Sequence, residues 1–295
     1  MHYRSEQALE MAVKSAAKAS PIDTGQAVTG FYFHRLLCRI FSDANSPFVL
    51  KGGHGMLART YDARATRDID LISESGDLDA ALDELKNLAG TDLGDFVSFE
   101  FVTARPIKVE DEYRSGLCVS FDAFLGSKKK QTVSIDLVID EIPLDRFDIL
   151  HPADRLDLPG LQTFDYKVHP VAAALADKFC GIIETHDGSP SSRVKDLTDI
   201  CIYATTSECD GAALSLRLNK ECSARKIAVP GRFSVPEGWL TKYGTVYAKT
   251  AAATAALKDY PRMQDAIELG ESLFNPALDG STAGKVWNPR LKLWR

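Results

Sequence analysis

The chain has 295 residues, 45% of them hydrophobic and 26% charged, which supports a globular protein with one large core or two modest ones, and two domains are expected. No stretch approaches the roughly 18 apolar residues of a membrane-spanning helix, and the N-terminus lacks the apolar core of a secretory signal, so we expect a cytoplasmic protein with no membrane partner. The net charge of −6 argues against the strongly basic surface of dedicated nucleic-acid binders, although a local basic patch is compatible with it.

Hydrophobic periodicity separates helices from strands in the first half of the chain. Turn residues then punctuate the segment 149–160 and place a domain boundary at 155/156. In domain 1–155 the predicted helices are 5–19, about 24–41, about 54–60 and 77–88, and the predicted strands are 47–51, around 68–72, 97–102, 118–123 and 132–138. This order favours an α/β (α+β) fold in which helices pack on a mixed sheet.

Residues 156–295 are predicted to form a second, mostly helical domain. Its predicted helices are 171–183, one that starts near 193, about 209–220 and about 245–271. Six cysteines are spread along the chain without Cys-x-x-Cys spacing, so we expect reduced, mostly buried thiols and neither a zinc site nor a disulfide framework.

Two carboxylates of the second predicted strand point to a chemistry. Asp68 and Asp70 are two residues apart, so on a strand they face the same side, beside the turn made by Gly52 and Gly53. Like charges held that close are costly unless a cation lies between them, and a hard divalent cation with phosphate oxygens in its shell satisfies both. A lone Asp-x-Asp would favour a solvent-facing pair, but the glycines upstream favour metal ligation.

Three kinds of neighbour have expected roles at this site. Gly52 and Gly53 either make a simple tight turn or let backbone N–H groups at the start of the next helix hold a triphosphate. Thr66 shares the face of the two carboxylates, so its hydroxyl can reach a phosphate or a metal-bound water. Lys51 is also a candidate phosphate contact, although alternation along the strand could turn it away.

Further charged residues lie on two predicted helices of the second domain. Lys178 sits among apolar neighbours, where a lysine needs a partner or must extend to solvent. Asp196 and Asp199 are three residues apart and can share a helix face, and Lys195 can pair with Asp199. A solvated charged face explains these residues about as well as a site does.

These motifs resemble those of the AbiEii-type (AbiEii/AbiGii) nucleotidyltransferases, the toxin halves of bacterial toxin–antitoxin and phage-defence pairs, which belong to the DNA polymerase β-like superfamily. The matching residues are Lys51-Gly52-Gly53, Arg64-x-Thr66-x-Asp68-x-Asp70, Lys178 and Lys195-Asp196-Leu197-x-Asp199. The resemblance runs from about residue 48 to residue 203. It departs from the family pattern at two points: no serine follows the glycines, which leaves phosphate binding there to backbone N–H groups and His54, and the segment 193–195 is a loose form of the late motif.

The resemblance implies a polymerase β-like core that uses Mg2+ or Mn2+ and an NTP as substrate. Asp68 and Asp70 would bind the metal with a third carboxylate from a neighbouring strand, and Asp136 is placed as that residue would be, with an ordinary strand-edge aspartate as the alternative. Asp136 would then help to deprotonate an attacking 3′-hydroxyl. Lys178 would neutralise the leaving pyrophosphate, and Asp196 would join the site.

The same resemblance implies that the enzyme adds a nucleoside monophosphate to RNA, at the 3′ end of tRNA, and stops translation unless a cognate antitoxin restrains it. Two other functions are compatible with the residues. One is nucleotidyl transfer to a small molecule or a protein. The other is a non-catalytic module that binds a nucleotide or a partner, against which the intact Asp68, Asp70 and Lys178 weigh.

Overall fold

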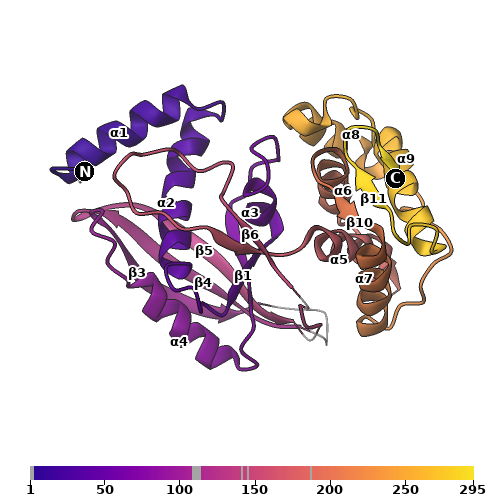
Figure 1. Ribbon diagram of the computed structural model, residues 1–295, viewed down its shortest axis with the longest axis horizontal. Helices are drawn as coiled ribbons and strands as arrows, with labels where there is room; N and C mark the ends of the chain where they lie inside the picture. The colour runs from indigo at the N-terminus through magenta and orange to yellow at the C-terminus, as the bar shows by residue number, and fades with distance from the viewer. Residues whose placement is uncertain (1–2, 108–113, 141, 145, 187) are drawn as a thin grey trace. The chain divides into compact units, whose positions relative to one another are not determined.

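The computed structural model describes residues 3–107, 114–140, 142–144, 146–186 and 188–295 (Figure 1). The chain forms two compact units, the first made of Met1–Tyr61 and Ala65–His169 and the second of Asp62–Arg64 and Pro170–Arg295. The predicted boundary at 155/156 therefore falls within the first unit. The reason is that the chain after this point returns to the sheet of the first unit as one more strand before it leaves at Pro170.

The first unit is built on a seven-stranded mixed sheet in the order β3-β4-β5-β2-β1-β7-β6. Its strands are β1 (Phe48–Lys51), β2 (Asp68–Ser73), β3 (Val97–Pro106), β4 (Arg114–Leu125), β5 (Lys128–Asp140), β6 (Asp148–Leu150) and β7 (Tyr166–Val168). β1 is antiparallel to β2 and parallel to β7, while β2 is parallel to β5, which confirms the predicted mixed sheet. β6 and β7 were not predicted, because strands of three residues are too short to show an alternating pattern.

Side chains cap the starts of three helices of the first unit. The helices are α1 (Glu6–Ala19), α2 (Thr24–Ile40), α3 (Gly52–Leu57) and α4 (Leu78–Ala89). The side chains of Ser5, Asp23 and Asp77 accept hydrogen bonds from backbone N–H groups at the starts of α1, α2 and α4. These helices lie close to the predicted ones, although α3 begins directly at the glycines rather than at residue 54.

The core of the first unit lies on one face of the sheet. Ile69, Leu71 and Ile135 from the central strands share one buried cluster with Leu37 of α2 and Leu85 of α4. Because side chains alternate along a strand, the residues between them point to the opposite face. That opposite face carries a small apolar cluster of Val49, Ile72 and Val138. Polar side chains lie on the same face two residues after Val49 and two residues before Ile72 and Val138.

The second unit is mostly helical, as the sequence predicts. It contains α5 (Val171–Ile183), α6 (Val194–Thr206), α7 (Gly211–Ala224), α8 (Trp239–Ala252), the short 3-10 helix η1 (Ala255–Leu257) and α9 (Met263–Leu278), with the two-residue or three-residue strands β8 (Thr185–His186), β9 (Ser189–Pro190), β10 (Cys209–Asp210), β11 (Val286–Asn288) and β12 (Leu293–Trp294). The single helix predicted over about 245–271 is wrong. The helix is interrupted between α8 and α9, where Pro261 lacks the N–H that a continuous helix needs.

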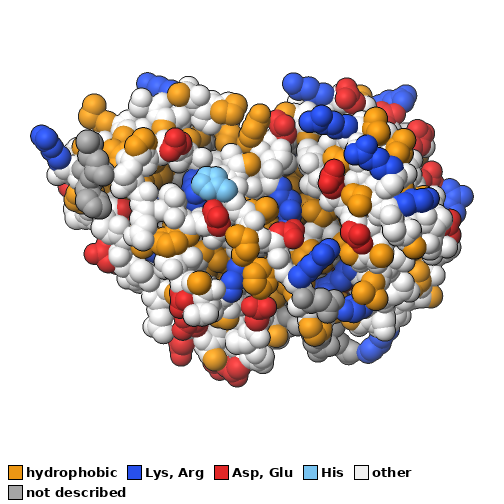
Figure 2. All heavy atoms as spheres, viewed as in Figure 1, with side chains coloured by type: hydrophobic (Ala, Val, Ile, Leu, Met, Phe, Trp, Pro, Cys, Tyr) orange, Lys and Arg blue, Asp and Glu red, His pale blue; other side chains and the backbone are white. Residues whose placement is uncertain are grey.

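Exposed basic side chains are common on the second unit. Figure 2 shows several Lys and Arg side chains on the face of this unit that is in view. The exposed ones are Arg193, Lys195, Lys226, Arg232, Lys242, Lys249, Lys258, Arg262, Lys285, Arg290 and Arg295. The chain thus has a net negative charge although this unit exposes many Lys and Arg side chains.

Two expectations from composition can be compared with the structure. All six cysteines lie among the described residues, no disulfide joins them, and five are buried while Cys118 is partly exposed. No helix in the described part of the chain is long and apolar enough to cross a membrane.

Candidate active site

Polar side chains form a row across four neighbouring strands of the first unit. The strand register pairs Cys118 of β4 with Asp136 of β5, Asp136 with Asp70 of β2, and Asp70 with Lys51 of β1. Residues paired in this way share a face of the sheet, and Asp68 lies on the same face because it is two residues before Asp70. The three predicted metal ligands therefore project from one face of two adjacent strands, and Lys51 is on that face too.

The carboxylates of this row influence one another. Partial burial raises the pKa of Asp136 above its ordinary value, and the negative charge of Asp68 raises it further. A hydrogen bond from Cys118 and the positive charge of Lys51 act in the opposite direction but do not cancel the increase. Asp68 and Asp136 thus repel each other, and a bound cation would relieve this repulsion.

The two glycines bring α3 into close contact with the carboxylate strand. Gly52 has a φ of 60°, in the left-handed region that favours glycine, and a Cβ there would overlap the carboxylate of Asp70. A Cβ on Gly53 would lie 2.6 Å from Cβ of Thr66. Thr66 in turn donates from Oγ1 to Oδ1 of Asp68 over 3.1 Å. Close packing against the site is thus a structural reason for both glycines, beside the phosphate binding expected of their N–H groups.

His54 lies inside the first unit. It is 4% exposed, and its ring Nδ1 is 2.8 Å from the main-chain oxygen of Asp68. Burial lowers the pKa of His54 to about 4, so the ring is neutral near pH 7. A direct phosphate contact, the role that the resemblance suggested for His54, does not fit this buried and neutral ring.

The oxygen donors fit a hard divalent cation. Among the described residues no group of three or more His, Cys, Asp or Glu side chains is already close enough together to hold a metal ion, so ligation by all three aspartates requires their side chains to turn toward one another. Carboxylate oxygens are the ligands that Mg2+ and Mn2+ prefer, and two of these three repel each other without a cation. We therefore take Asp68, Asp70 and Asp136 as the residues that would hold the metal.

The second unit gathers the other predicted site residues in a buried ion cluster. Nζ of Lys178 on α5 is 2.6 Å from Oδ2 of Asp199 and 3.3 Å from Oδ1 of Asp196, both on α6. Arg64 donates to both oxygens of Asp199 over 2.6 and 2.8 Å, and Nε of Arg193 is 2.7 Å from Oδ2 of Asp196. The sequence did not predict the pairing of Arg64 with Asp199, although Arg64 belongs to the motif; the suggested partner Lys195 is exposed instead.

Charges in this cluster stabilise one another. Burial alone would lower the pKa of Lys178, but Asp199 and Asp196 outweigh it and raise that pKa above its ordinary value. Burial alone would raise the pKa of Asp199, but Lys178 and Arg64 hold it below its ordinary range. Lys178 is therefore a permanent cation held in place inside the unit, and it does not extend to solvent.

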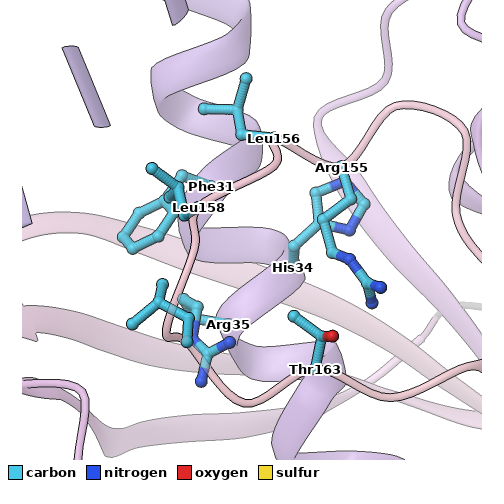
Figure 3. Close-up of a pocket in the computed structure, with 8 residues that line it drawn as sticks. Phe31, His34, Arg35, Arg155, Leu156, Leu158 and Thr163 are labelled. Atoms are coloured by element: carbon cyan, nitrogen blue, oxygen red, sulfur yellow. The ribbon is translucent and has the colours of Figure 1, made fainter. Parts of the chain in front are cut away.

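A small hollow elsewhere in the first unit is not a substrate site. Figure 3 shows it between His34 and Arg35 of α2 and the segment that carries Arg155, Leu156 and Leu158. Its volume of about 20 Å³ has room for about one water molecule. A nucleotide does not fit in this space.

The sequence of this chain matches a known protein family over most of its length. The model of the nucleotidyl transferase AbiEii toxin family, from type IV toxin–antitoxin systems, matches residues 35–280. The chain belongs to this family. It is therefore a nucleotidyltransferase toxin, and membership implies an NTP substrate, a divalent metal and an antitoxin. The matched range contains the polar row and the ion cluster.

The other comparisons gave weaker likenesses. No curated protein matches the chain. Among solved structures, JHP933 from Helicobacter pylori is 14% identical with a TM-score of 0.48, and the match covers 88% of this chain and 96% of that one. A second H. pylori protein, provisionally named a nucleotidyltransferase, is 16% identical with a TM-score of 0.44, covering 84% and 93% of the two chains. The Megavirus polyadenylate synthase is 12% identical with a TM-score of 0.29, covering 83% and 42%. The family assignment rests on the family match alone.

Proposed function

We propose that the protein transfers a nucleoside monophosphate from an NTP to the 3′ end of tRNA, releases pyrophosphate and so blocks aminoacylation and translation. The observation that carries the proposal is the row of Asp68, Asp70 and Asp136 on one face of β2 and β5. We assign the first unit to the polymerase β-like nucleotidyltransferase core on the same ground, since that chemistry needs carboxylates placed together for Mg2+ or Mn2+.

In the proposed reaction the aspartates and Lys51 of the row act together with residues beside it. A divalent cation bound there would neutralise charge on the triphosphate and would make the acceptor hydroxyl more acidic. Asp68, Asp70 and Asp136 would hold this cation, and Thr66 orients Asp68 by donating a hydrogen bond from Oγ1 to Oδ1. Asp136 accepts the proton of the attacking 3′-hydroxyl. Lys51, on the same face, and the N–H groups near Gly52 and Gly53 contact the phosphates.

Lys178 and Asp196 are proposed to serve the same reaction from the second unit. The cluster holds three cations, Lys178, Arg64 and Arg193, against two carboxylates, Asp196 and Asp199, which leaves a net charge of +1. A fixed positive charge favours the pyrophosphate leaving group, whose negative charge grows as the bond breaks. Asp196 acts by holding Lys178.

An RNA acceptor agrees with the exposed basic side chains of the second unit, such as Lys249 and Lys258, because phosphate contacts supply most of the affinity for a polynucleotide. A small-molecule or protein acceptor would use the same carboxylates and would not need this basic surface. A non-catalytic binding module would not need the repelling carboxylates.

The test is to incubate purified protein with Mg2+, each labelled NTP in turn and total tRNA, and to resolve the products on a denaturing gel. Asp68→Ala should lose transfer and keep the fold, whereas Glu100→Ala, which removes an exposed carboxylate of β3, should behave like the wild type. Transfer by Asp68→Ala would disprove the mechanism. Label in a small molecule or in protein, with none in RNA, would show that this molecule, and not tRNA, is the acceptor.

A further inference from the structure

We propose that His54 is a positioning residue for the metal site, which acts by donating a hydrogen bond from its ring Nδ1–H to the main-chain carbonyl of Asp68. This inference rests on the proposed function, because it assumes that Asp68 is a metal ligand. It assigns to His54 a role that acts through another residue, with no contact to the nucleotide.

The need for such a residue follows from the strand register. The antiparallel pairing of β1 with β2 ends at Lys51 and Asp70, because the chain turns at Gly52 into α3. Asp68 lies two residues beyond this last pair, so β5 pairs with it through Ser134 but β1 offers it no register partner. A main-chain carbonyl at a strand end needs some other donor, and the His54 ring, 2.8 Å away, supplies one.

The ring is held where the bond requires it. His54 is 4% exposed and meets Phe33 of α2 edge-on, with the ring centroids 4.7 Å apart. Gly55, the next residue, packs so closely that a Cβ there would lie 3.3 Å from the main-chain oxygen of Leu50. These contacts leave the ring little freedom to turn away from Asp68.

The bond also fixes which nitrogen carries the proton. A carbonyl oxygen only accepts hydrogen bonds, so Nδ1 must be the protonated nitrogen. Two other titratable groups lie close to the ring, the buried His34 and the partly buried Asp154, and Nε2 of His34 is 3.2 Å from Oδ2 of Asp154. The Nδ1–H tautomer is therefore a specific and observable consequence of the geometry.

Three consecutive residues of α3 thus support three positions of the metal strand and the segment before it. Gly52 packs on the carboxylate of Asp70, Gly53 packs on Thr66, and His54 binds the main chain of Asp68. Groups that orient the ligands of a metal are typically worth about 10- to 100-fold in metal affinity or activity. The start of α3 is thus a support for the ligands, and His54 is its polar contact.

The experiment compares two substitutions of similar polarity. In His54→Asn the amide nitrogen can take the place of Nδ1, whereas in His54→Gln it reaches the place of Nε2. Binding of Mn2+ alone is measured from the electron paramagnetic resonance signal of unbound Mn2+, with the melting temperature of each variant as a check of folding. We expect His54→Asn to stay within a few-fold of the wild type and His54→Gln to bind about 10- to 100-fold more weakly.

Equal Mn2+ affinity for wild type and folded His54→Gln would overturn the inference, as would equal weakening in both variants. A readout that needs no variant is the ¹⁵N shift of the histidine ring in labelled wild type: an Nε2–H tautomer of His54 at neutral pH would also overturn it. The same measurements distinguish a failure of this inference from a failure of the proposed function. A wild type that binds Mn2+ in this way but transfers no nucleotide would refute the transfer reaction and support the role of His54, while a wild type without Mn2+ binding would refute both.

Discussion

The Asp199→Asn substitution removes a buried negative charge and keeps the size of the side chain. Asp199 is fully buried on α6 and accepts two hydrogen bonds from Arg64 and one from Lys178. The amide that replaces it has one oxygen instead of two and no charge. Two cations then lose their shared partner inside the second unit.

The size of the effect follows from the burial of each partner. Removing one member of a buried ion pair costs about 3–5 kcal/mol, because the other member is left uncompensated. Here the side chain of Arg64 is 20% exposed and regains some water, and Lys178 keeps Asp196. We therefore expect the low end, about 3 kcal/mol of unfolding free energy. For a unit of this size that corresponds to a decrease in melting temperature of roughly 10 °C.

The effect should depend on pH in one direction. The pKa of Asp199 lies below its ordinary value in the folded protein, because Lys178 and Arg64 outweigh burial. Its stabilising contribution is therefore complete above the unfolded pKa of about 4 and is lost as the pH falls through the lower folded pKa. The difference between wild type and variant should be constant between pH 7 and 5 and should shrink on further acidification.

Differential scanning calorimetry from pH 7 to pH 3 measures both the loss of unfolding free energy and its dependence on pH. Glu208→Gln is the matched control, since it removes an exposed carboxylate of the same unit and should leave the melting temperature nearly unchanged. A difference below about 1 kcal/mol for Asp199→Asn would show that the cluster is no more than a surface ion pair. A difference that is as large at pH 3 as at pH 5 would show that lost packing, and not lost charge, causes it.

Two further substitutions test other parts of the structure. Gly52→Ala should abolish or strongly reduce transfer, because alanine is strained by about 1–2 kcal/mol at this φ and its Cβ would displace the Asp70 carboxylate. Gly76→Ala, where a Cβ meets open space, is the control, and equal transfer rates for the two variants would contradict the packing described. Trp239→Phe should destabilise the second unit by about 1 kcal/mol or more in urea unfolding. The reason is that the buried Nε1–H, which donates to the Ser191 carbonyl over 2.9 Å, is lost. An unchanged midpoint of unfolding would show that this hydrogen bond contributes nothing.

Local patterns predicted what local physics determines. The two-residue period of a strand is enough to place Asp68 and Asp70 on one face, and helical spacing is enough to find the helix that carries Lys178. The sequence also contained the signal that was missed between α8 and α9. Pro261 interrupts an otherwise helical pattern, and giving it more weight would have corrected the long helix.

Contacts between distant segments could not be predicted in this way. The position of Asp136 beside Asp70 depends on the parallel pairing of β2 with β5, which only the family resemblance suggested. Arg64 and Asp199 are 135 positions apart, and no period in the sequence connects them. The burial of His54 follows from the way α3 packs under β2, which requires knowledge of the fold rather than of the residue.

The way the chain is divided between the two units has a consequence for dissecting the protein. Residues 62–64 belong to the second unit, although the chain on both sides of them belongs to the first, so the second unit is discontinuous in sequence. A fragment that starts at Pro170 would contain all five major helices of that unit and would still lack Arg64, leaving the carboxylate of Asp199 without two of its hydrogen bonds. A single cut after His169 therefore leaves the first unit whole but cannot release the second unit intact. Attempts to express the second unit alone, or to exchange it between relatives, would have to carry this three-residue loop along.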